Sequence, residues 1–460
     1  MTSESPDVIE NVLYDDIEIG QSARLVRTLT LEDIRAFAAV SGDVNPAHLD
    51  ASFANESMFH GVIGHGMWTG SLVSTVLGTI LPGPGTIYLE QSFRFKRPVR
   101  IGETLTVTVT VAEKHDEKHS LVLDCTIDNQ DGNQVVVGQA KVMAPTEKII
   151  RPRMGIPKLN VFDPETRVQS FLGSLQPTQP IRIGLIHPTD QISLTAAVEM
   201  ATTGKLTPVL IGPEKKIREL ALRLALDIHA LEVIDAEHSH QAAKRACDKA
   251  ARGDVEALAR GNLDKNEIVG AIRETQALHT KTSLSHIFRF DVPLYHKPLL
   301  LTDAVLHHRP SLTDKVFIVQ NAICAAQYLG VETPKVALLA AVATIDSDYQ
   351  STLDAAALCK MADRKQITGG HLDGPVVLDQ AVSEASNGSD CSDILVAPDN
   401  ESANMLARQL EYFAGASSCG VIVGARVPVA LAMRTASVQS HLLSAIFAGK
   451  IADRFRTDKP

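Results

Sequence analysis

Residues 65–83, HGMWTGSLVSTVLGTILPG, form a mostly apolar stretch that ends with Pro82 and Gly83. Proline and glycine at this place are typical of a helix end, so the stretch predicts one long apolar helix. A helix that is apolar on most of its sides is buried by neighbouring elements. The residues around it must therefore supply a surface that covers it.

Four segments after this helix show the alternation of apolar and polar residues that is typical of strands. They are TIYLEQSFRFKRP (86–98), TLTVTVTVAE (104–113), HSLVLDCTIDNQDG (119–132) and QVVVGQAKVMAP (134–145). The Asp-Gly step in DNQDGN is typical of a hairpin turn between antiparallel strands. The pattern predicts an α+β domain over residues 1–145, in which a curved sheet wraps one helix.

The ten residues before the helix region, SGDVNPAHLD (41–50), contain two side chains of chemical interest. Asp and Asn-Pro are common in turns, and the Asn-Pro step moves the chain out of helical geometry. His48 follows Asp43 by five residues, and Pro46 stiffens the path between them, so we expect both side chains to face one small volume. Two interpretations remain open: a turn that ends a helix, or a carboxylate and an imidazole that hold a water.

The second interpretation fits the addition of water to an α,β-unsaturated thioester. That reaction needs a base, an acid and donors for the enolate oxygen, and Asp43 and His48 are candidates for the two proton transfers. Gly66 is a candidate donor, because the first amides of a helix are unpaired and glycine allows close approach. Asn45 is a candidate to orient the Asp43 segment, and Ser71 to contact the substrate.

The stretch SGDVNPAHLD, followed by FHGVIGHGMWTGSLVSTVLG, resembles the signature of MaoC-like, (R)-specific enoyl-CoA hydratases. PGPGTIYLEQSFRFKRPV is similar to the strand that follows the helix in that family. The resemblance covers nearly all of residues 15–145 and implies a hot-dog fold, with Asp43 and His48 as the catalytic pair and Gly66 as an oxyanion donor. The implied product is an (R)-3-hydroxyacyl-CoA. A hot-dog thioesterase, whose water attacks the carbonyl carbon, is the rival within the fold.

The residue pattern changes after position 145. Residues 146–180 contain five prolines and no sustained period, which predicts a linker that is partly docked. From residue 181 to 460, strand-like and helix-like segments alternate, which predicts an α/β domain with a mostly parallel sheet covered on both faces.

This second part resembles phosphate acetyl- and butyryltransferases, and more closely the butyryl-type branch, over about 180–450. The resemblance rests most densely on STLDAAALCKMADRKQITGGHLDGPVVLDQAVS, with support from HPTDQISLTAAVEMATTGKLTPVLIGP and SHIFRFDVPLYHKPLLLTDAVL. It implies two α/β subdomains with the active cleft between them, exchange of CoA and phosphate on an acyl group, and dimerisation. The order of the two parts also resembles a known fused bifunctional arrangement.

Phosphate attack on a thioester needs donors for phosphate, an oxyanion donor and a proton for the leaving thiolate. The candidate residues are Thr280, Lys281 and Ser285 on one subdomain, and Ser351 and Thr352 on the other. Arg260 and Arg426 are further cations that would help to bind phosphate.

The sequence also departs from the transferase pattern. ATIDSDYQ (343–350) stands where butyryl-type relatives usually have Glu and an Asn-Pro pair, and Ala259-Arg260 where they often have lysine before a glycine. An alternative therefore stays open: an active hydratase joined to a non-catalytic transferase-like module that binds acyl-CoA or mediates oligomerisation.

Composition excludes several classes of function. A net charge of -10 argues against a nucleic-acid partner, and no apolar run is long enough to span a membrane. The start MTSESPDVIE has no signal-peptide pattern, and six scattered cysteines fit reduced thiols, so we expect a cytoplasmic protein.

The histidines at 238, 240, 307 and 308 lack the spacing of a zinc site, so we expect no metal. We expect CoA thioesters and inorganic phosphate as substrates, no cofactor, and a homo-oligomer.

Overall fold

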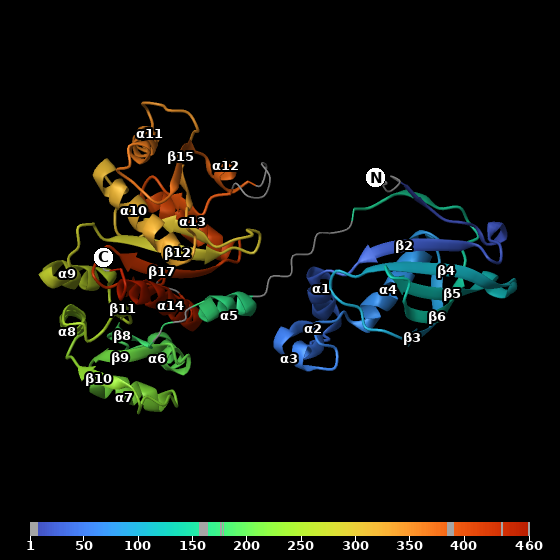
Figure 1. Cartoon of the computed structure of the whole chain (residues 1–460), viewed down its shortest axis with the longest axis horizontal. Coiled ribbons are helices and arrows are strands. Elements are labelled where there is room, and N and C mark those ends of the chain that lie inside the picture. The colour runs from blue at the N-terminus through green and yellow to red at the C-terminus, as the bar shows by residue number, and fades with distance from the viewer. Residues whose placement is uncertain are drawn as a thin grey trace. The chain divides into compact units, whose positions relative to one another are not determined.

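The computed structural model describes residues 8–155, 164–174, 177, 179–383, 391–433 and 436–458. The chain divides into two compact units, Met1–Val161 and Phe162–Pro460, whose elements are labelled in Figure 1. The division falls inside the segment 146–180 that the sequence predicts as a linker.

The first unit is an α+β domain. Its strands are β1 (Val8–Glu10), β2 (Ser22–Thr28), β3 (Ile87–Phe95), β4 (Thr104–His115), β5 (Ser120–Asn129), β6 (Gln134–Met143) and β7 (Ile150–Pro152). Its helices are η1 (Tyr14–Asp16), α1 (Leu31–Ser41), α2 (Pro46–Leu49), α3 (Ala51–Glu56), α4 (Gly66–Thr79) and η2 (Glu117–His119). The four strands predicted after the long helix are confirmed as β3 to β6.

Five of these strands form one antiparallel sheet in the order β2-β4-β5-β6-β3. The alternation in β4 places Val107, Val109 and Val111 in the core, where they pack with the buried face of α4. Figure 1 shows α4 lying against the sheet, which curves around it. This is the hot-dog arrangement that the sequence predicts, in which burial of an apolar helix stabilises both the helix and the sheet.

Helix α4 ends at Thr79, four residues before the predicted end at Gly83. The residue before a proline is pushed out of helical geometry, and the chain has left the helix before it reaches Leu81 and Pro82. The helix therefore ends before Pro82 and not at it.

The segment that carries Asp43 is built by local caps. Thr30 and Asp33 form a reciprocal capping box at the start of α1, and Gly42 ends that helix with a φ of 75°, which glycine adopts without strain. The Asn45 side chain then accepts from Ala47 N at 3.1 Å and starts α2. The segment both ends one helix and starts another, so the predicted turn is confirmed.

The second unit contains eleven further strands in one sheet. They are β8 (Ile181–Ile186), β9 (Leu206–Gly212), β10 (Glu232–Asp235), β11 (Ala257–Arg260), β12 (Ser285–Asp291), β13 (Leu299–Thr302), β14 (Lys335–Leu339), β15 (His371–Val376), β16 (Ile394–Val396), β17 (Ser417–Val423) and β18 (Val429–Ala430). The helices are α5 (Pro164–Ser174), α6 (Gln191–Thr202), α7 (Glu214–Arg223), α8 (Ser239–Ala251), α9 (Lys265–Glu274), η3 (Gln276–Leu278), α10 (Leu312–Tyr328), α11 (Gln350–Asp363), α12 (Leu378–Val382), α13 (Asn400–Tyr412) and α14 (Val438–Phe455).

The strand order β10-β9-β8-β11-β18-β17-β12-β13-β16-β14-β15 has two parallel halves. Strands β12, β17 and β18 make the antiparallel pairings of the middle, between those halves. One hydrophobic core lies under α6, α10 and α14, and two others lie under α8 with α9 and under α12 with α13. The prediction of a mostly parallel sheet covered on both faces is confirmed.

The predicted linker contains two regular elements that the sequence does not predict. Strand β7 pairs with β1 in the first unit. Helix α5 packs on α14 in the second unit, where Phe171 is buried and the Ser174 hydroxyl accepts from Lys450 Nζ at 2.9 Å. These docked pieces occur because short apolar stretches between the prolines find partners far along the chain.

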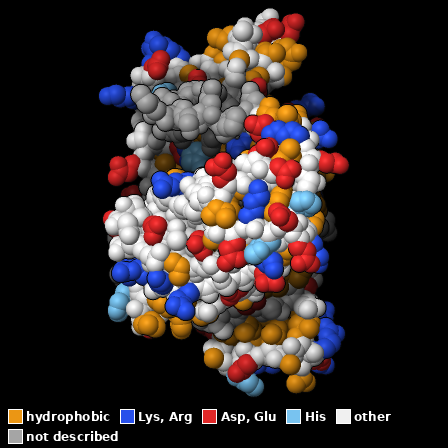
Figure 2. Space-filling model, turned by 90° about the vertical axis from the view of Figure 1, so that its right-hand side faces the viewer, with side chains coloured by type: hydrophobic (Ala, Val, Ile, Leu, Met, Phe, Trp, Pro, Cys, Tyr) orange, Lys and Arg blue, Asp and Glu red, His pale blue; other side chains and the backbone are white. Residues whose placement is uncertain are grey.

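The described surface mixes charges of both signs. Figure 2 shows Lys and Arg side chains interspersed with Asp and Glu on one face. Within the described residues, no helix has the length and apolar character needed to cross a membrane.

Candidate active sites

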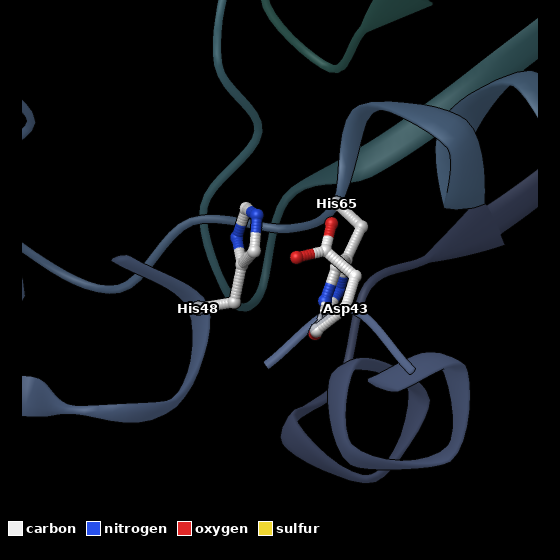
Figure 3. A group of neighbouring side chains, drawn as sticks. All are labelled: Asp43, His48 and His65. Carbon is white, nitrogen blue, oxygen red and sulfur yellow. Dashed lines mark hydrogen bonds between the residues drawn. The ribbon is translucent and has the colours of Figure 1, made fainter. Parts of the chain in front are cut away.

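The carboxylate of Asp43 and the ring of His48 face one another in the first unit (Figure 3). Asp43 lies between the end of α1 and the start of α2, and His48 is buried on α2. Their ligand atoms and those of His65 all lie within 4.8 Å of one another. Among the described residues no direct hydrogen bond joins the Asp43 carboxylate to His48, and this spacing suits a small molecule that bonds both groups.

The orientation of the His48 ring is set by the backbone. His48 Nδ1 lies 2.9 Å from the carbonyl oxygen of Ile63. A carbonyl only accepts, so Nδ1 carries the proton and Nε2 carries the lone pair that is available for proton transfer. The Asp43 carboxylate accepts from Asn45 N at 3.3 Å, which directs it from the side of its own loop.

A cavity of about 280 Å³ opens beside this pair. It is lined by His48, Phe59, Ile63, Gly64, Gly66, Thr69, Phe95, Lys96, Arg97, Pro98, Val99 and Val135. Gly66 is the first residue of α4, and among the described residues no acceptor bonds its amide. The amide is therefore a free donor at the positive end of the helix dipole, next to an apolar cavity.

The two remaining residues predicted for this site occupy different positions. The side chain of Asn45 caps α2, and it is the backbone amide of Asn45 that bonds the Asp43 carboxylate. Ser71 is not among the lining residues, and its hydroxyl donates to Trp68 O at 2.7 Å. The buried side chain of Thr69 lines the cavity instead, two residues earlier on the same helix.

One site residue was missed by sequence reasoning. His65, 1% exposed, lies directly before α4, and its Nε2 is 3.0 Å from the backbone oxygen of Asp43. Its ring centroid lies 3.9 Å from that of His48. The only signal in the sequence was its position next to Gly66, which carries no information about these contacts.

In the second unit, a cavity of about 520 Å³ contains two of the predicted residues. Thr280 and Lys281 line it together with Arg426. The Lys281 and Arg426 residues are both exposed to solvent. Tyr328, Ile451 and Phe455 form an apolar part of the wall. Such a cavity combines cations suited to a phosphate with an apolar surface suited to an acyl chain or a pantetheine arm.

The hydroxyls of the predicted transferase residues are mostly bonded to the protein itself. Thr280 Oγ1 donates to Gly424 O at 2.7 Å. Ser285 is fully buried and bonds Asn321 Nδ2 at 2.9 Å. Thr352 is fully buried as well, and its Oγ1 lies 2.8 Å from Tyr349 O at the start of α11. Ser351, its neighbour on α11, is half-buried, and neither residue of α11 lines the cavity that contains Lys281.

A carboxylate–imidazole pair lies at the end of β13. Asp303 is buried and accepts from His307 Nδ1 at 2.8 Å and from the amides of Val305 and Leu306 at 2.9 Å. Burial alone would raise the pKa of Asp303, but these bonds outweigh it and lower the pKa; the same pairing raises the pKa of His307. The sequence gives no reason to pair these residues.

Two further histidines of the second unit, His286 and His238, have roles within the fold. Burial lowers the pKa of His286, on β12, to about 4, so its ring stays uncharged at neutral pH. His238 caps α8 by accepting from Gln241 N at 3.2 Å. His238 therefore serves as a helix cap.

Comparison with known proteins agrees with this division of the chain. Residues 16–130 match the family described as MaoC like domain, and residues 246–448 match the family described as phosphate acetyl/butaryl transferase. The chain therefore joins a MaoC-like hydro-lyase domain of hot-dog fold to an acyltransferase domain.

Individual relatives give the same picture. A phosphate acetyltransferase of Rickettsia felis is 41% identical over 283 residues, which are 59% of this chain and 81% of that relative. A phosphate butyryltransferase of Clostridium beijerinckii is 32% identical over 60% of this chain and 94% of the relative. The R-hydratase PhaJ1 of Pseudomonas aeruginosa is 42% identical over 34% of this chain and 99% of that chain, with a TM-score of 0.33. The chain belongs to the phosphate acetyl/butyryltransferase family, and it carries the MaoC-like domain in addition.

Proposed function

We propose that the first unit hydrates a trans-2-enoyl-CoA to an (R)-3-hydroxyacyl-CoA. The observation that carries this proposal is that His48 and Gly66, whose amide has no acceptor among the described residues, line one cavity, while the Asp43 carboxylate faces the His48 ring. Two proton-transfer groups face one another, and a donor for an oxyanion lies at the start of the adjacent helix.

In the proposed step, Asp43 and His48 together take up one proton and give one proton back. A water held by Asp43 and His48 loses one proton to the pair as its oxygen bonds the β-carbon. The electrons of the double bond move to the thioester oxygen, where the Gly66 amide stabilises the enolate. The enolate then takes one proton from the pair at the α-carbon, so the pair returns to its starting state. No cofactor takes part.

The test is an assay of the intact chain with crotonyl-CoA. We expect loss of the enoyl absorbance without release of free thiol, and a product of (R) configuration. Release of free CoA at the rate of enoyl loss would instead identify a thioesterase, because its water attacks the carbonyl carbon.

For the second unit we propose exchange of CoA and phosphate on an acyl group. Lys281 and Arg426 at the apolar cavity support this, since a phosphate binds best to paired cationic donors. Thr280 Oγ1 is engaged with Gly424 O, so its contribution is to hold the cavity wall.

A non-catalytic module is the second candidate for this unit. It is favoured by the engagement of the Thr280, Ser285 and Thr352 hydroxyls in bonds within the protein. CoA release from butyryl-CoA, measured with and without phosphate, separates the two candidates. Phosphate-dependent release supports the transferase, whereas binding of butyryl-CoA without such release supports the module.

We also propose a cytoplasmic homo-oligomer that acts on small acyl-CoA substrates. Strand β3 is an edge of the first sheet, and its Ile87, Leu89 and Phe95 side chains are exposed. An exposed apolar edge strand is a site at which a second copy would bury surface. Light scattering of the intact chain tests this, and a mass equal to one chain would contradict it.

A further inference from the structure

The buried histidine before α4 contacts both members of the proposed catalytic pair. His65 Nε2 donates to the Asp43 carbonyl at 3.0 Å, across 22 positions of sequence. Its ring lies on the His48 ring with centroids 3.9 Å apart and planes inclined by 33°. His65 is also the residue that immediately precedes Gly66. One side chain therefore connects the Asp43 segment, the His48 ring and the start of α4.

Three such side chains close together raise the question of a metal ion. An imidazole binds a metal along its nitrogen lone pair, which lies in the plane of the ring. His48 Nδ1 and His65 Nε2 each bond a backbone carbonyl, so only one nitrogen of each ring is left for a further ligand. The two rings contact each other with planes inclined by 33°.

The protonation of His65 follows from its two nitrogens. A carbonyl only accepts, so Nε2 carries the proton in its bond to Asp43 O. Nδ1 is buried and has no hydrogen-bond partner among the described residues. The ring is therefore held by one donated hydrogen bond on the Asp43 side and by ring contact with His48.

We propose that His65 is a positioning residue for hydration: it holds the Asp43 segment through its Nε2 proton and the His48 ring through its face. This proposal rests on the proposed hydratase function. Asp43 is exposed to solvent, and its other hydrogen bonds are to its sequence neighbours Ser41 and Asn45. The bond from His65 to the Asp43 carbonyl therefore helps to set where the carboxylate lies. A displacement of 1 Å at a reacting group is enough to lower the rate by about 10²-fold.

Two substitutions separate the two contacts. His65→Phe keeps a ring against His48 and loses the donor, whereas His65→Gln keeps a donor for the Asp43 carbonyl and loses the ring. With crotonyl-CoA we expect each variant to lower kcat by about 10-fold, and His65→Leu, which loses both contacts, by about 100-fold. KM should stay within about 2-fold of the intact protein, because His65 is not among the residues that line the cavity.

The control is His115→Gln, a substitution of an exposed histidine at the end of β4. Thermal unfolding of every variant identifies loss of fold, and the partial retention of rate in the Phe and Gln variants relative to Leu excludes a merely structural effect. If all three variants keep normal kcat while Asp43→Asn is inactive, the positioning role is wrong and the hydratase assignment stands. If the intact chain does not hydrate crotonyl-CoA, both proposals fail together.

Discussion

The two halves of the chain differ in how their candidate residues come together. In the first unit, Asp43, His48 and Gly66 lie within 24 residues of sequence; His48 and Gly66 line one cavity, and Asp43 faces His48. In the second unit, Lys281 lines a cavity, whereas Ser351 and Thr352 lie at the start of α11 and do not line it. A contiguous motif can be located from its own spacing, whereas a site assembled from distant segments depends on the packing of the whole sheet.

The largest expected effect concerns the pair in the first unit. Asp43→Asn and His48→Ala should each lower crotonyl-CoA hydration by about 10²–10⁴-fold, because each removes a proton-transfer group. Phosphate-dependent CoA release by the second unit should not change in the same samples. A near-normal hydration rate in either variant would show that Asp43 and His48 are not the catalytic pair, and the contrast between the two units would then fail.

A second prediction concerns the cations of the second unit. The double substitution Lys281→Ala with Arg426→Ala should lower phosphorolysis of butyryl-CoA by about 10²–10⁴-fold, since hydrogen bonds to charged groups contribute about 1.5–3 kcal/mol each. Lys360→Ala, at an exposed ion pair on α11, is the matched control. Equal rates in the double variant and the control would show that the cavity is not the phosphate site.

A smaller effect is expected at the start of α4. A Cβ atom at Gly66 would lie 3.3 Å from the Phe95 ring, so Gly66→Ala narrows the cavity at the oxyanion donor and should lower kcat about 10-fold. Gly78→Ala on the same helix is the control, because a Cβ there meets nothing within 4 Å. If both variants lose activity equally, helix stability rather than access to the amide explains the loss.

The smallest effect is a pH dependence of stability in the second unit. Asp303 raises the pKa of His307 on folding, so their pairing contributes fully below the ordinary histidine pKa of about 6.5 and is lost as pH rises through the raised value. Urea unfolding of the intact protein and of His307→Gln should therefore differ most on the acid side and converge on the alkaline side. The control is His308→Gln, and a constant difference across pH would contradict the pairing.

Much of the first unit was predictable because its signals are local. The alternation in residues 104–113 identifies β4, and Asn45-Pro46 identifies the start of α2, since each depends on neighbouring residues only. The contact between His65 and Asp43 was not predictable, because nothing in the intervening 22 positions specifies which buried nitrogen meets which carbonyl. For the same reason the bonds that anchor Thr352 at the start of α11 appeared only in the structure.

The amino-acid sequence alone predicted a curved sheet around one helix, an alternating α/β part after it, and the pair formed by Asp43 and His48, because periodicity and short-range spacing depend on neighbouring residues only. The hot-dog class followed from the resemblance to MaoC-like hydratases. Tertiary structure alone decided that His65 contacts both members of the pair, that Ser71 is outside the cavity and that Asp303 pairs with His307. Such contacts depend on the close packing of side chains from distant segments, and only the folded chain brings those segments together.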